Sequence, residues 1–262
     1  MTTKPTVLIT GASSGIGVAY AERFARRGHD VVLVARDAAR LEAVADRIGR
    51  ASGVRAEVLA ADLTRESDLG RVEARLRQDT AIGVLVNNAG VLGQGTFLTQ
   101  DSLDISGLIA LNVTALARLA NAIAPRLATA GAGAIVNIAS VVGLAPELGL
   151  SVYGATKAFV LFLSQGLQGE LGKQGVYVQA VLPSVTRTEL WERAGRNVDD
   201  LPAAMTTGDL VDAALVGFDR RETVTIPPLP DDAQWVAFEA ARQAMLPNFM
   251  RADAAARYQT AA

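Results

Sequence analysis

The feature that most constrains the fold of this chain is an alternation of short apolar runs with longer helical stretches. Runs rich in β-branched residues lie at 7–9, 31–34, 54–59, 82–86, 135–138 and 176–181, with a seventh at 223–226. Such runs are typical of strands that helices bury on both faces. Helices are expected at 15–27, 38–51, 65–78, 101–129, 151–173 and 208–220. This order predicts an α/β fold with a doubly wound parallel sheet of about seven strands and right-handed crossovers.

Neither an internal repeat nor a Gly/Ser-rich or Pro-rich linker divides the 262 residues. The sequence therefore predicts a single domain over 1–262, with a core over 5–228 and a helical tail over 229–262. The tail carries Trp235, Phe238, Met245, Phe249 and Met250. Two interpretations of this tail stay open: a helix that packs on the sheet edge, or a lid or partner-contacting segment.

Composition excludes several classes of function. The formal net charge of −2 gives no general attraction to nucleic acid or to an anionic membrane. There is no cysteine and the only histidine is His29, so we expect no thiol nucleophile, no Ser-His-Asp triad and no metal site. The apolar run that begins at Val7 is too short for a signal peptide or a membrane span, so a cytoplasmic location is expected.

A glycine-rich segment, Thr10–Gly17, joins the first strand to the first helix. Gly11, Gly15 and Gly17 allow a tight turn and a close backbone approach to a diphosphate, whose charge a helix N-terminus favours. The spacing differs from G-x-G-x-x-G and from the phosphate loop that ends in Gly-Lys-Ser/Thr. An ordinary glycine-rich turn is the alternative. If the segment binds a dinucleotide, its contacts come from Gly11, Ser13, Ser14, Gly15, Ile16 and Gly17.

The end of the second strand indicates which dinucleotide is preferred. An NAD site usually has an acidic residue here, whereas this chain has Ala35 and Arg36. Because Arg36 would pair with a 2′-phosphate, the sequence favours NADP (NADPH). Asp37 is interpreted as the cap of helix 38–51, and Thr64 as the cap of helix 65–78. Two further segments end strands at the same edge of the sheet, where adenine and ribose are expected: Asp62-Leu63 and Asn87-Asn88-Ala89-Gly90.

A candidate catalytic group follows the fifth strand. Tyr153 and Lys157, four residues apart on one helix, project from the same face, and Ser140 lies thirteen residues before the tyrosine. An ammonium group beside a phenol favours the phenolate, so Lys157 is expected to lower the pKa of Tyr153. Tyr153 would donate a proton to the alkoxide formed by hydride transfer, Ser140 would hydrogen-bond the substrate oxygen, and Lys157 would also bind the nicotinamide ribose.

These motifs together resemble the short-chain dehydrogenase/reductase family over about residues 5–190. The resemblance is carried by the glycine segment, Asp62, the segment 87–90, Asn112 and the Ser140, Tyr153 and Lys157 set. It implies a Rossmann fold with strand order 3-2-1-4-5-6-7 and NAD(P)-dependent carbonyl/alcohol redox chemistry. It also implies that Asn112 holds a water that relays protons to Lys157.

One motif departs from the family pattern. The family often has Pro-Gly after the sixth strand, whereas this chain has Pro183-Ser184. Pro183, Val185 and Thr188 still fit a loop that touches the nicotinamide. Ser184 has to adopt the backbone conformation that glycine would supply, or the path of the loop shifts.

The predicted reaction is NADP-dependent hydride transfer between the nicotinamide and an apolar ketone or secondary alcohol. The apolar residues expected at the substrate are Leu92, Val141, Val142, Leu144, Pro146 and Leu148, and the polar candidates are Gln94 and Glu147. The alternatives are a 3-oxoacyl thioester reductase and a catalytically silent NADP-binding sensor or scaffold. The only partners expected are this small-molecule substrate and further copies of the chain.

Self-association is predicted from the helix 151–173. Ala155, Phe159, Phe162 and Gly166 recur there at helical spacing. In the resembling family this helix and the helix 101–129 pair across a two-fold axis, which implies a homodimer or homotetramer. The alternative is that Phe159 and Phe162 face the sheet.

Overall fold

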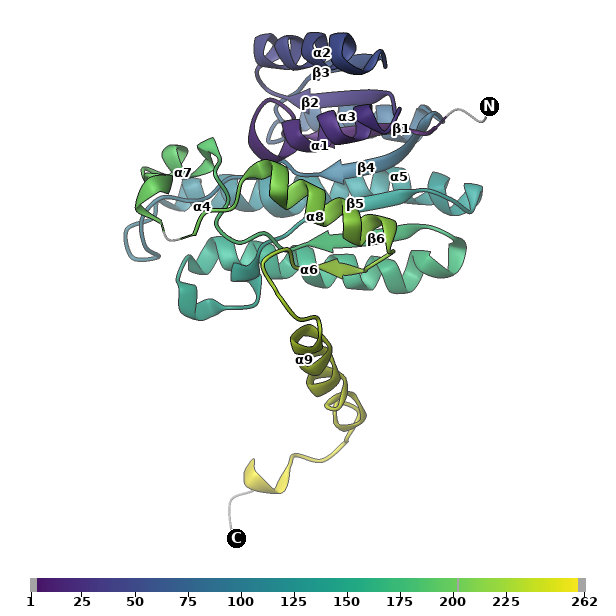
Figure 1. Cartoon of the computed structure of the whole chain (residues 1–262). Helices are drawn as coiled ribbons and strands as arrows, with labels where there is room; N and C mark the ends of the chain where they lie inside the picture. The colour runs from purple at the N-terminus through teal and green to yellow at the C-terminus, as the bar shows by residue number, and fades with distance from the viewer. Residues whose placement is uncertain (1–3, 202, 259–262) are drawn as a thin grey trace. The chain divides into compact units, whose positions relative to one another are not determined.

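The computed structural model describes residues 4–201 and 203–258, and its centre is one parallel β-sheet of seven strands (Figure 1). The strands are β1 Thr6–Thr10, β2 Val31–Ala35, β3 Ala56–Ala60, β4 Ile82–Asn87, β5 Ala134–Ile138, β6 Tyr177–Val181 and β7 Val224–Thr225. Their order is β3-β2-β1-β4-β5-β6-β7, with every neighbouring pair parallel. The predicted fold class is confirmed.

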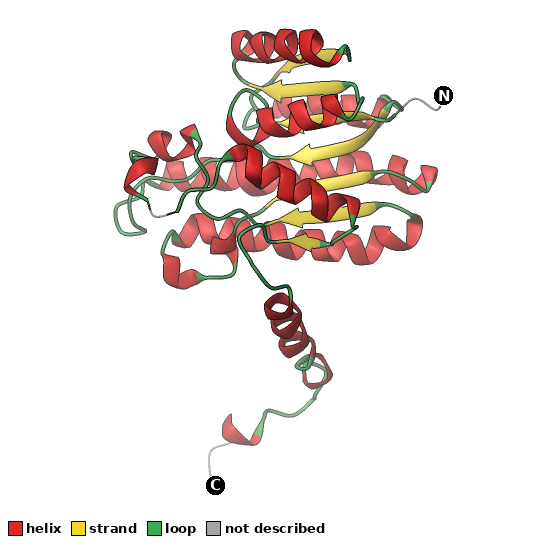
Figure 2. Cartoon of the chain, viewed as in Figure 1, coloured by secondary structure: helices red, strands yellow, loops and turns green. Residues whose placement is uncertain are grey.

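Helices cover both faces of the sheet (Figure 2). One face packs against α1 Gly15–Arg26, α2 Ala38–Ser52 and α8 Thr207–Asp219. The other packs against α3 Glu66–Gln78, α5 Leu116–Ala130 and α6 Ser151–Leu171. The alternation of side chains along a strand divides the core accordingly: Val7 and Ile9 of β1 pack with Phe24, and Leu8 packs with Leu119.

The predicted helix over 101–129 is divided in the structure. Helix α4, Ser102–Ile109, is followed by a π-helical turn over Ala110–Ala115 and then by α5. Such turns are rare and are frequently found at functional sites, and this one contains Asn112. By length and hydropathy Ser102–Ala130 could also cross a membrane, and half of its apolar window is buried in the fold. Core helices of soluble proteins meet the same criteria, so this one helix is weak evidence for a membrane span.

The two predicted helix caps have opposite outcomes. Asp37 caps α2 as expected, because its carboxylate accepts a hydrogen bond from the Arg40 amide at 3.0 Å. The prediction for Thr64 is wrong, since α3 begins after Arg65 and has no side-chain cap. The Thr64 hydroxyl instead donates to Asp62 Oδ1 at 2.7 Å, so it holds the carboxylate after β3.

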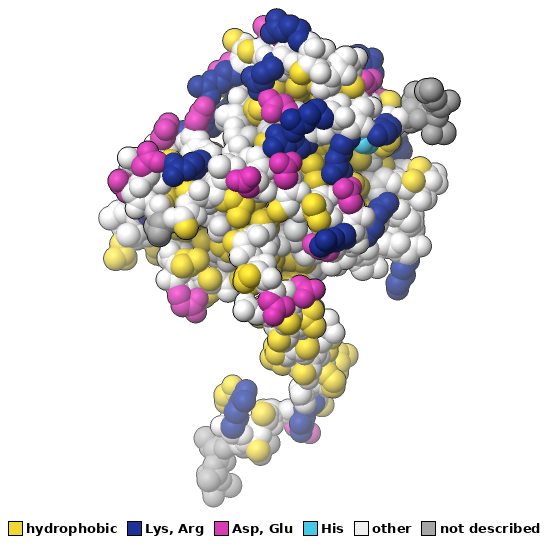
Figure 3. Space-filling view, in the orientation of Figure 1, with side chains coloured by type: hydrophobic (Ala, Val, Ile, Leu, Met, Phe, Trp, Pro, Cys, Tyr) yellow, Lys and Arg dark blue, Asp and Glu magenta, His cyan; other side chains and the backbone are white. Residues whose placement is uncertain are grey.

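Charged residues on the face of α1 and α8 are paired, and Figure 3 shows the two signs interspersed there. The Arg23 guanidinium donates two hydrogen bonds to Asp212, at 2.8 and 2.9 Å, and Arg27 makes the same pair of bonds with Asp219. These bidentate pairs join the first helix of the sheet to the last.

Helix α6 presents apolar residues to solvent. Phe162 is 78% exposed and Phe159 is 38% exposed, and Ala155 and Gly166 lie on the same exposed side. The alternative that both phenylalanines face the sheet is therefore wrong.

The chain consists of two compact units: the first ends at Pro227, and the second, smaller unit begins at Pro228. Within it, α9 Ala233–Gln243 stacks Trp235 on Phe238 with ring centroids 5.4 Å apart. No residue between 228 and 258 is buried. A helical tail was predicted here; the assignment of core and tail to a single domain stays a prediction.

The end of β1 is fixed by one buried hydroxyl, which generates a stability prediction. Thr10 Oγ1 accepts hydrogen bonds from the Asn88 and Ala89 amides, each at 3.0 Å, and so ties the turn after β4 to β1. Thr10→Val keeps the shape but leaves both amides without this acceptor, so we expect a loss of about 2 kcal/mol in the free energy of unfolding by urea titration. Thr6→Val is the control, because Thr6 is buried in the same strand and its hydroxyl has no hydrogen-bond partner among the described residues. Equal stabilities of the two variants would contradict this role of Thr10.

Candidate active site

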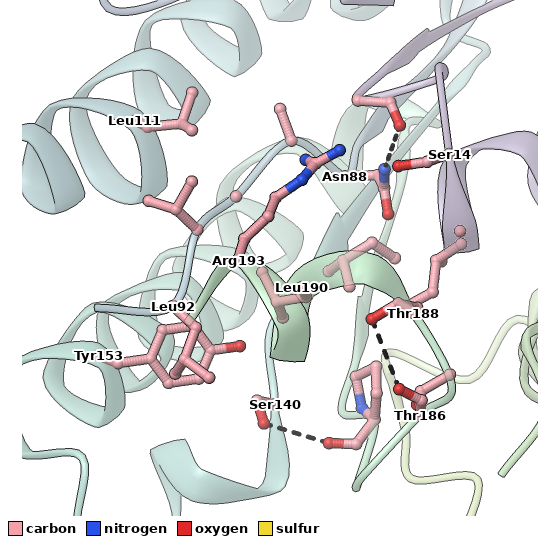
Figure 4. Close-up of a pocket in the computed structure, with 18 of the residues that line it drawn as sticks. Ser14, Asn88, Leu92, Leu111, Ser140, Tyr153, Thr186, Thr188, Leu190 and Arg193 are labelled. Carbon is pink, nitrogen blue, oxygen red and sulfur yellow. Dashed lines mark hydrogen bonds between the residues drawn. The ribbon is translucent and has the colours of Figure 1, made fainter. Parts of the chain in front are cut away.

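A cavity of about 600 Å³ lies where the strands end at their carboxyl edge (Figure 4). Its walls come from segments that follow six of the seven strands, from β1 to β6. The structure brings together most of the residues predicted for the site, namely Gly11, Ser13, Ser14, Gly15, Ile16, Arg36, Asp62, Leu63, Ala89, Gly90, Ser140, Tyr153, Lys157, Pro183, Val185 and Thr188.

Three predicted site residues lie behind the cavity wall: Gly17, Asn87 and Asn112. Asn87 is buried, and its side-chain amide donates to Asn137 Oδ1 at 3.0 Å and to the Leu116 carbonyl at 3.3 Å. Its side chain thus joins β4 to β5 and to α5.

The glycine segment has the shape that close approach to a phosphate requires. Gly11 has φ +66°, in the left-handed region that favours glycine. A Cβ at Gly17 would lie 2.2 Å from the Gly11 carbonyl oxygen, so no other residue fits there without moving the turn. Ser14, at the N-cap of α1, makes no side-chain capping bond. The first amides of α1 therefore remain available beside the cavity, and this cradle fits a diphosphate.

The end of β2 fits a 2′-phosphate. Arg36 is exposed at the cavity and forms no hydrogen bond or ion pair with the described residues, while Ala35 supplies no acidic group. Nearby, burial acts to raise the pKa of Asp62, but hydrogen bonds from Thr64 and the charges of Arg36 and Arg65 outweigh burial, so this pKa is lowered. The Asp62 carboxylate accepts bonds from the Thr64 amide and hydroxyl, which fix its position at the adenosine end of the cavity.

At the other end of the cavity, Tyr153 and Lys157 project from successive turns of α6. Lys157 is only 5% exposed, and its ammonium donates to the Ile138 carbonyl at the end of β5, at 2.8 Å. The Lys157 nitrogen lies 5.6 Å from the centre of the Tyr153 ring. A Cβ at Gly90 would make an ordinary contact with this nitrogen at 3.6 Å but a tighter one, 3.2 Å, with Asn112 Oδ1.

Burial governs the protonation of both side chains. Burial raises the pKa of Tyr153 to about 12, against a lowering by its hydrogen bond with Ser140. Burial also lowers the pKa of Lys157 to about 8. The lowered tyrosine pKa expected from the sequence is therefore absent, because loss of solvent around the phenol is the largest effect on this pKa. At neutral pH the phenol is protonated and the lysine is mostly charged.

Ser140 begins a short 3₁₀ turn after β5. Its hydroxyl donates to the Pro183 carbonyl at 3.1 Å, so the loops after β5 and β6 are joined beside Tyr153 (Figure 4). Ser184 does not have a positive φ. Ser184 therefore does not take the left-handed conformation that favours glycine, and a shifted path of the loop stays a prediction.

Asn112 positions the turn after β4 against α6. Its Oδ1 accepts from the Val91 amide and its Nδ2 donates to the Val91 carbonyl, both at 2.9 Å. Nδ2 also donates to Thr156 Oγ1 at 3.2 Å, and that hydroxyl donates to the Tyr153 carbonyl at 2.7 Å. The π-helical turn thus connects Asn112 to the helix that carries the tyrosine and lysine.

The substrate side of the cavity is mainly apolar. Of the residues predicted for it, Leu92, Val141, Val142 and Leu148 line the cavity, whereas Leu144, Pro146, Gln94 and Glu147 do not. Gln94 donates instead to the Arg193 carbonyl at 2.9 Å. The sequence did not predict six further lining residues, which lie in α2, in the π-helical turn, directly before α6 and after Thr188: Arg40, Leu111, Leu150, Leu190, Trp191 and Arg193. For two of them, Leu190 and Trp191, the sequence offers an indication, because they closely follow Thr188, which is predicted to contact the cofactor.

Comparison with known proteins agrees with this arrangement. A family model described as short chain dehydrogenase matches residues 5–199. The very-long-chain 3-oxoacyl-CoA reductase of Bos taurus is 38% identical over 187 residues, which cover 70% of this chain and 60% of that protein. The chain thus matches less than two thirds of the length of this curated relative.

Two solved structures are similar over nearly the whole chain. A short-chain dehydrogenase from Sphingobium yanoikuyae in complex with NADPH is 63% identical, with a TM-score of 0.96 over 97% of this chain and 100% of that one. A bulky-bulky ketone specific alcohol dehydrogenase from Comamonas testosteroni is 54% identical, with a TM-score of 0.92 over 99% and 100%.

The parallel sheet, the glycine turn at its central strand and the cavity across its carboxyl edge define a Rossmann-type dinucleotide-binding fold. The match over residues 5–199 is more specific. The chain belongs to the short-chain dehydrogenase family.

Proposed function

We propose that this chain is an NADPH-dependent oxidoreductase that transfers a hydride between the nicotinamide and a bulky, apolar ketone or secondary alcohol. The observation that carries the proposal is one cavity that holds a protonated Tyr153, a buried Lys157 and Ser140 at an apolar end, and Arg36 beside a glycine cradle at the other. The likeness to a structure that contains NADPH supports the cofactor.

NADPH would be held along the whole cavity. The amides of Ser14 to Gly17 would bind the diphosphate, Arg36 the 2′-phosphate, and Asp62 with Leu63 the adenine side. Pro183, Val185 and Thr188 would lie at the nicotinamide, which when bound supplies or accepts the hydride.

Tyr153 would manage the proton. With a pKa near 12 it carries its proton at neutral pH, so it is ready to protonate a substrate oxygen that gains negative charge. Ser140 would turn its hydroxyl proton from the Pro183 carbonyl to the same oxygen and hold it near the phenol. In the alcohol-oxidising direction the phenol has to lose its proton first, so high pH favours that direction.

Lys157 would stabilise the charge that Tyr153 leaves behind. Its ammonium uses one donor on Ile138 and keeps the remaining donors for the ribose hydroxyls. Asn112, whose amide is bonded to Val91 and Thr156, would position this group and hold the water that relays protons to Lys157.

The substrate would carry bulky apolar groups on both sides of the carbonyl. This end of the cavity is lined by apolar side chains: Leu92, Leu148, Leu150, Leu190 and Trp191. After Thr188, the lining residues include one charged side chain, that of Arg193. The similarity to a bulky-bulky ketone specific alcohol dehydrogenase supports this class. A cytoplasmic location is part of the same proposal.

A 3-oxoacyl thioester is the second candidate, because the curated relatives include 3-oxoacyl-CoA reductases. A panel of diaryl ketones, aryl-alkyl ketones and 3-oxoacyl thioesters, assayed with NADPH and NADH at the nicotinamide absorbance, separates the two. We expect the bulky ketones to have the highest kcat/KM. Higher values for the thioesters would favour the second candidate, and no turnover with any compound would contradict the reductase function.

Removal of the phenolic hydroxyl is expected to stop turnover. Tyr153→Phe deletes the transferable proton without changing the glycine cradle, so kcat should fall by roughly 10²–10⁴-fold while the dissociation constant of NADPH changes little. Single-turnover reduction and fluorescence titration of NADPH measure the two quantities. If chemistry limits the rate and more than about a tenth of wild-type turnover remains, Tyr153 is not the proton donor.

Loss of the Arg36 charge is expected to remove the preference for NADPH. Arg36→Ala deletes a charge-assisted bond to the 2′-phosphate, so the KM for NADPH should rise about 10- to 100-fold while that for NADH changes little. Equal use of both cofactors by the wild-type protein would refute the preference.

The pH profile is expected to follow Lys157. Because its pKa is about 8 and that of Tyr153 is about 12, the lysine loses its charge first as the pH rises. The kcat/KM for NADPH, which reports the free enzyme, should be flat from pH 7 and should decline above about pH 8. Lys157→Arg is the control. Because arginine stays protonated over this range, the pH profile of the variant should lack this inflection, whatever activity the variant retains. A wild-type profile that stays flat to pH 10 would contradict the assignment.

We propose in addition that copies of the chain associate through α6, and that the tail belongs to the same domain. The exposed Phe159 and Phe162 support a homodimer or homotetramer, as does family membership. Light scattering at micromolar concentration should give at least twice the 27.4 kDa chain mass. Phe162→Glu should lower that mass, whereas Leu98→Glu, in a loop residue that is 93% exposed, should not. A wild-type mass of one chain would end the proposal.

A further inference from the structure

A second arginine lies at the adenosine end of the cavity and is already paired. Arg40 follows Arg36 by four residues and lines the same cavity. Its Nη1 lies 2.8 and 3.1 Å from the two carboxylate oxygens of Glu189, a residue 149 positions further along the chain. Arg36 forms no such pair with the described residues. A bound phosphate would therefore meet one arginine without an ion pair, Arg36, and one that is already paired, Arg40.

Glu189 lies on α7, Glu189–Arg193, which contributes Leu190, Trp191 and Arg193 to the cavity wall. The same carboxylate accepts a bond from Arg193 at 2.6 Å, so one anion pairs with two cations. At its other end α7 is held by the bond from Gln94 to the Arg193 carbonyl. Helix α7 is therefore tied to the start of α2 through Arg40 and to the loop after β4 through Gln94.

The Arg40–Glu189 pair is weak enough to be exchanged. Its side chains are 49% and 39% exposed, and exposed pairs of this kind contribute little to stability. A phosphate monoester carries a charge of about −1.5 to −2 at pH 7, against −1 for a carboxylate, and offers three acceptor oxygens. A 2′-phosphate at Arg36 would thus compete successfully for the guanidinium of Arg40, which lines the same cavity four residues further along the chain.

We propose that Arg40 is a second 2′-phosphate-binding residue, and that Glu189 competes with the phosphate for it. Glu189 is then a specificity-determining residue on the substrate-side helix. NADPH would draw Arg40 from Glu189 and release α7 from α2, leaving the carboxylate to Arg193. NADH, which has no 2′-phosphate, would leave the tie in place. This inference rests on the NADPH preference proposed above.

Equilibrium binding to the full chain tests the competition without turnover. Dissociation constants for NADPH, NADH and 2′,5′-ADP would be measured by fluorescence and calorimetry at 150 mM salt. Glu189→Gln removes this pair and leaves Arg40 its weaker contact with Asp37 at 3.6 Å, so NADPH and 2′,5′-ADP should bind about two- to fivefold more tightly, with NADH unchanged. Arg40→Gln should weaken NADPH about tenfold and leave NADH unchanged. In the double variant, Glu189→Gln should have no further effect.

The matched control is Glu192→Gln, which removes the same charge from the same helix. Glu192 is exposed and makes no ion pair in the described part of the chain, so its effect on NADPH should be clearly smaller than that of Glu189→Gln. Equal effects of the two glutamate variants would overturn the inference, as would an Arg40→Gln variant that binds NADPH like the wild type. Either outcome would overturn only this inference, because a wild type that still binds NADPH leaves the proposed function intact. A wild type that binds neither dinucleotide would contradict the proposed function and this inference with it.

Discussion

The burial of one ammonium group, that of Lys157, is the constraint on which the site depends. A cation this poorly exposed is costly unless it is well solvated by protein groups, and it has three protons to donate. Among the described residues the Ile138 carbonyl takes one of them. The remaining donors point to a ligand with hydroxyl groups, and the ribose of a dinucleotide supplies these. The same loss of solvent keeps Tyr153 protonated, so one environment sets the charge of both residues.

The parallel sheet brings the other components to this environment. Because all strands run in one direction, the segments after β1 to β6 meet at one edge, although they are spread along the chain from Gly11 to Arg193. Buried polar contacts then fix the positions of these segments. Thr10 holds the turn after β4, and Asn112 joins the same turn to α6. Ser140 joins the loop after β5 to the loop after β6. The site is thus held by strand ends and by helix α6, and α7 is attached across it by exposed ion pairs and a side-chain bond.

Much of this follows from sequence because it depends on local patterns. Apolar periodicity predicts the sheet and its helices, and the spacing of Gly11, Ser140, Tyr153 and Lys157 predicts the two ends of the cavity. The errors arise where tertiary contacts decide. Thr64 bonds to Asp62 instead of capping α3, and the π-helical turn around Asn112 interrupts a helix whose apolar pattern is continuous. The pKa of Tyr153 depends on how far the folded chain excludes solvent from the phenol. The spacing of Tyr153 and Lys157 gives no information about this burial. Leu190, Trp191 and Arg193 reach the cavity only because the loop after β6 folds back over it.

If the cavity functions as proposed, a hydride passes from NADPH to the carbonyl carbon of a bulky ketone and the chain supplies the proton. Reduction of a diaryl ketone with NADPH deuterated at both C4 positions, followed by mass spectrometry of the alcohol, tests it most directly. We expect one deuterium on the carbinol carbon of the product. A product without deuterium at that carbon, or no product while NADPH is bound, would contradict it.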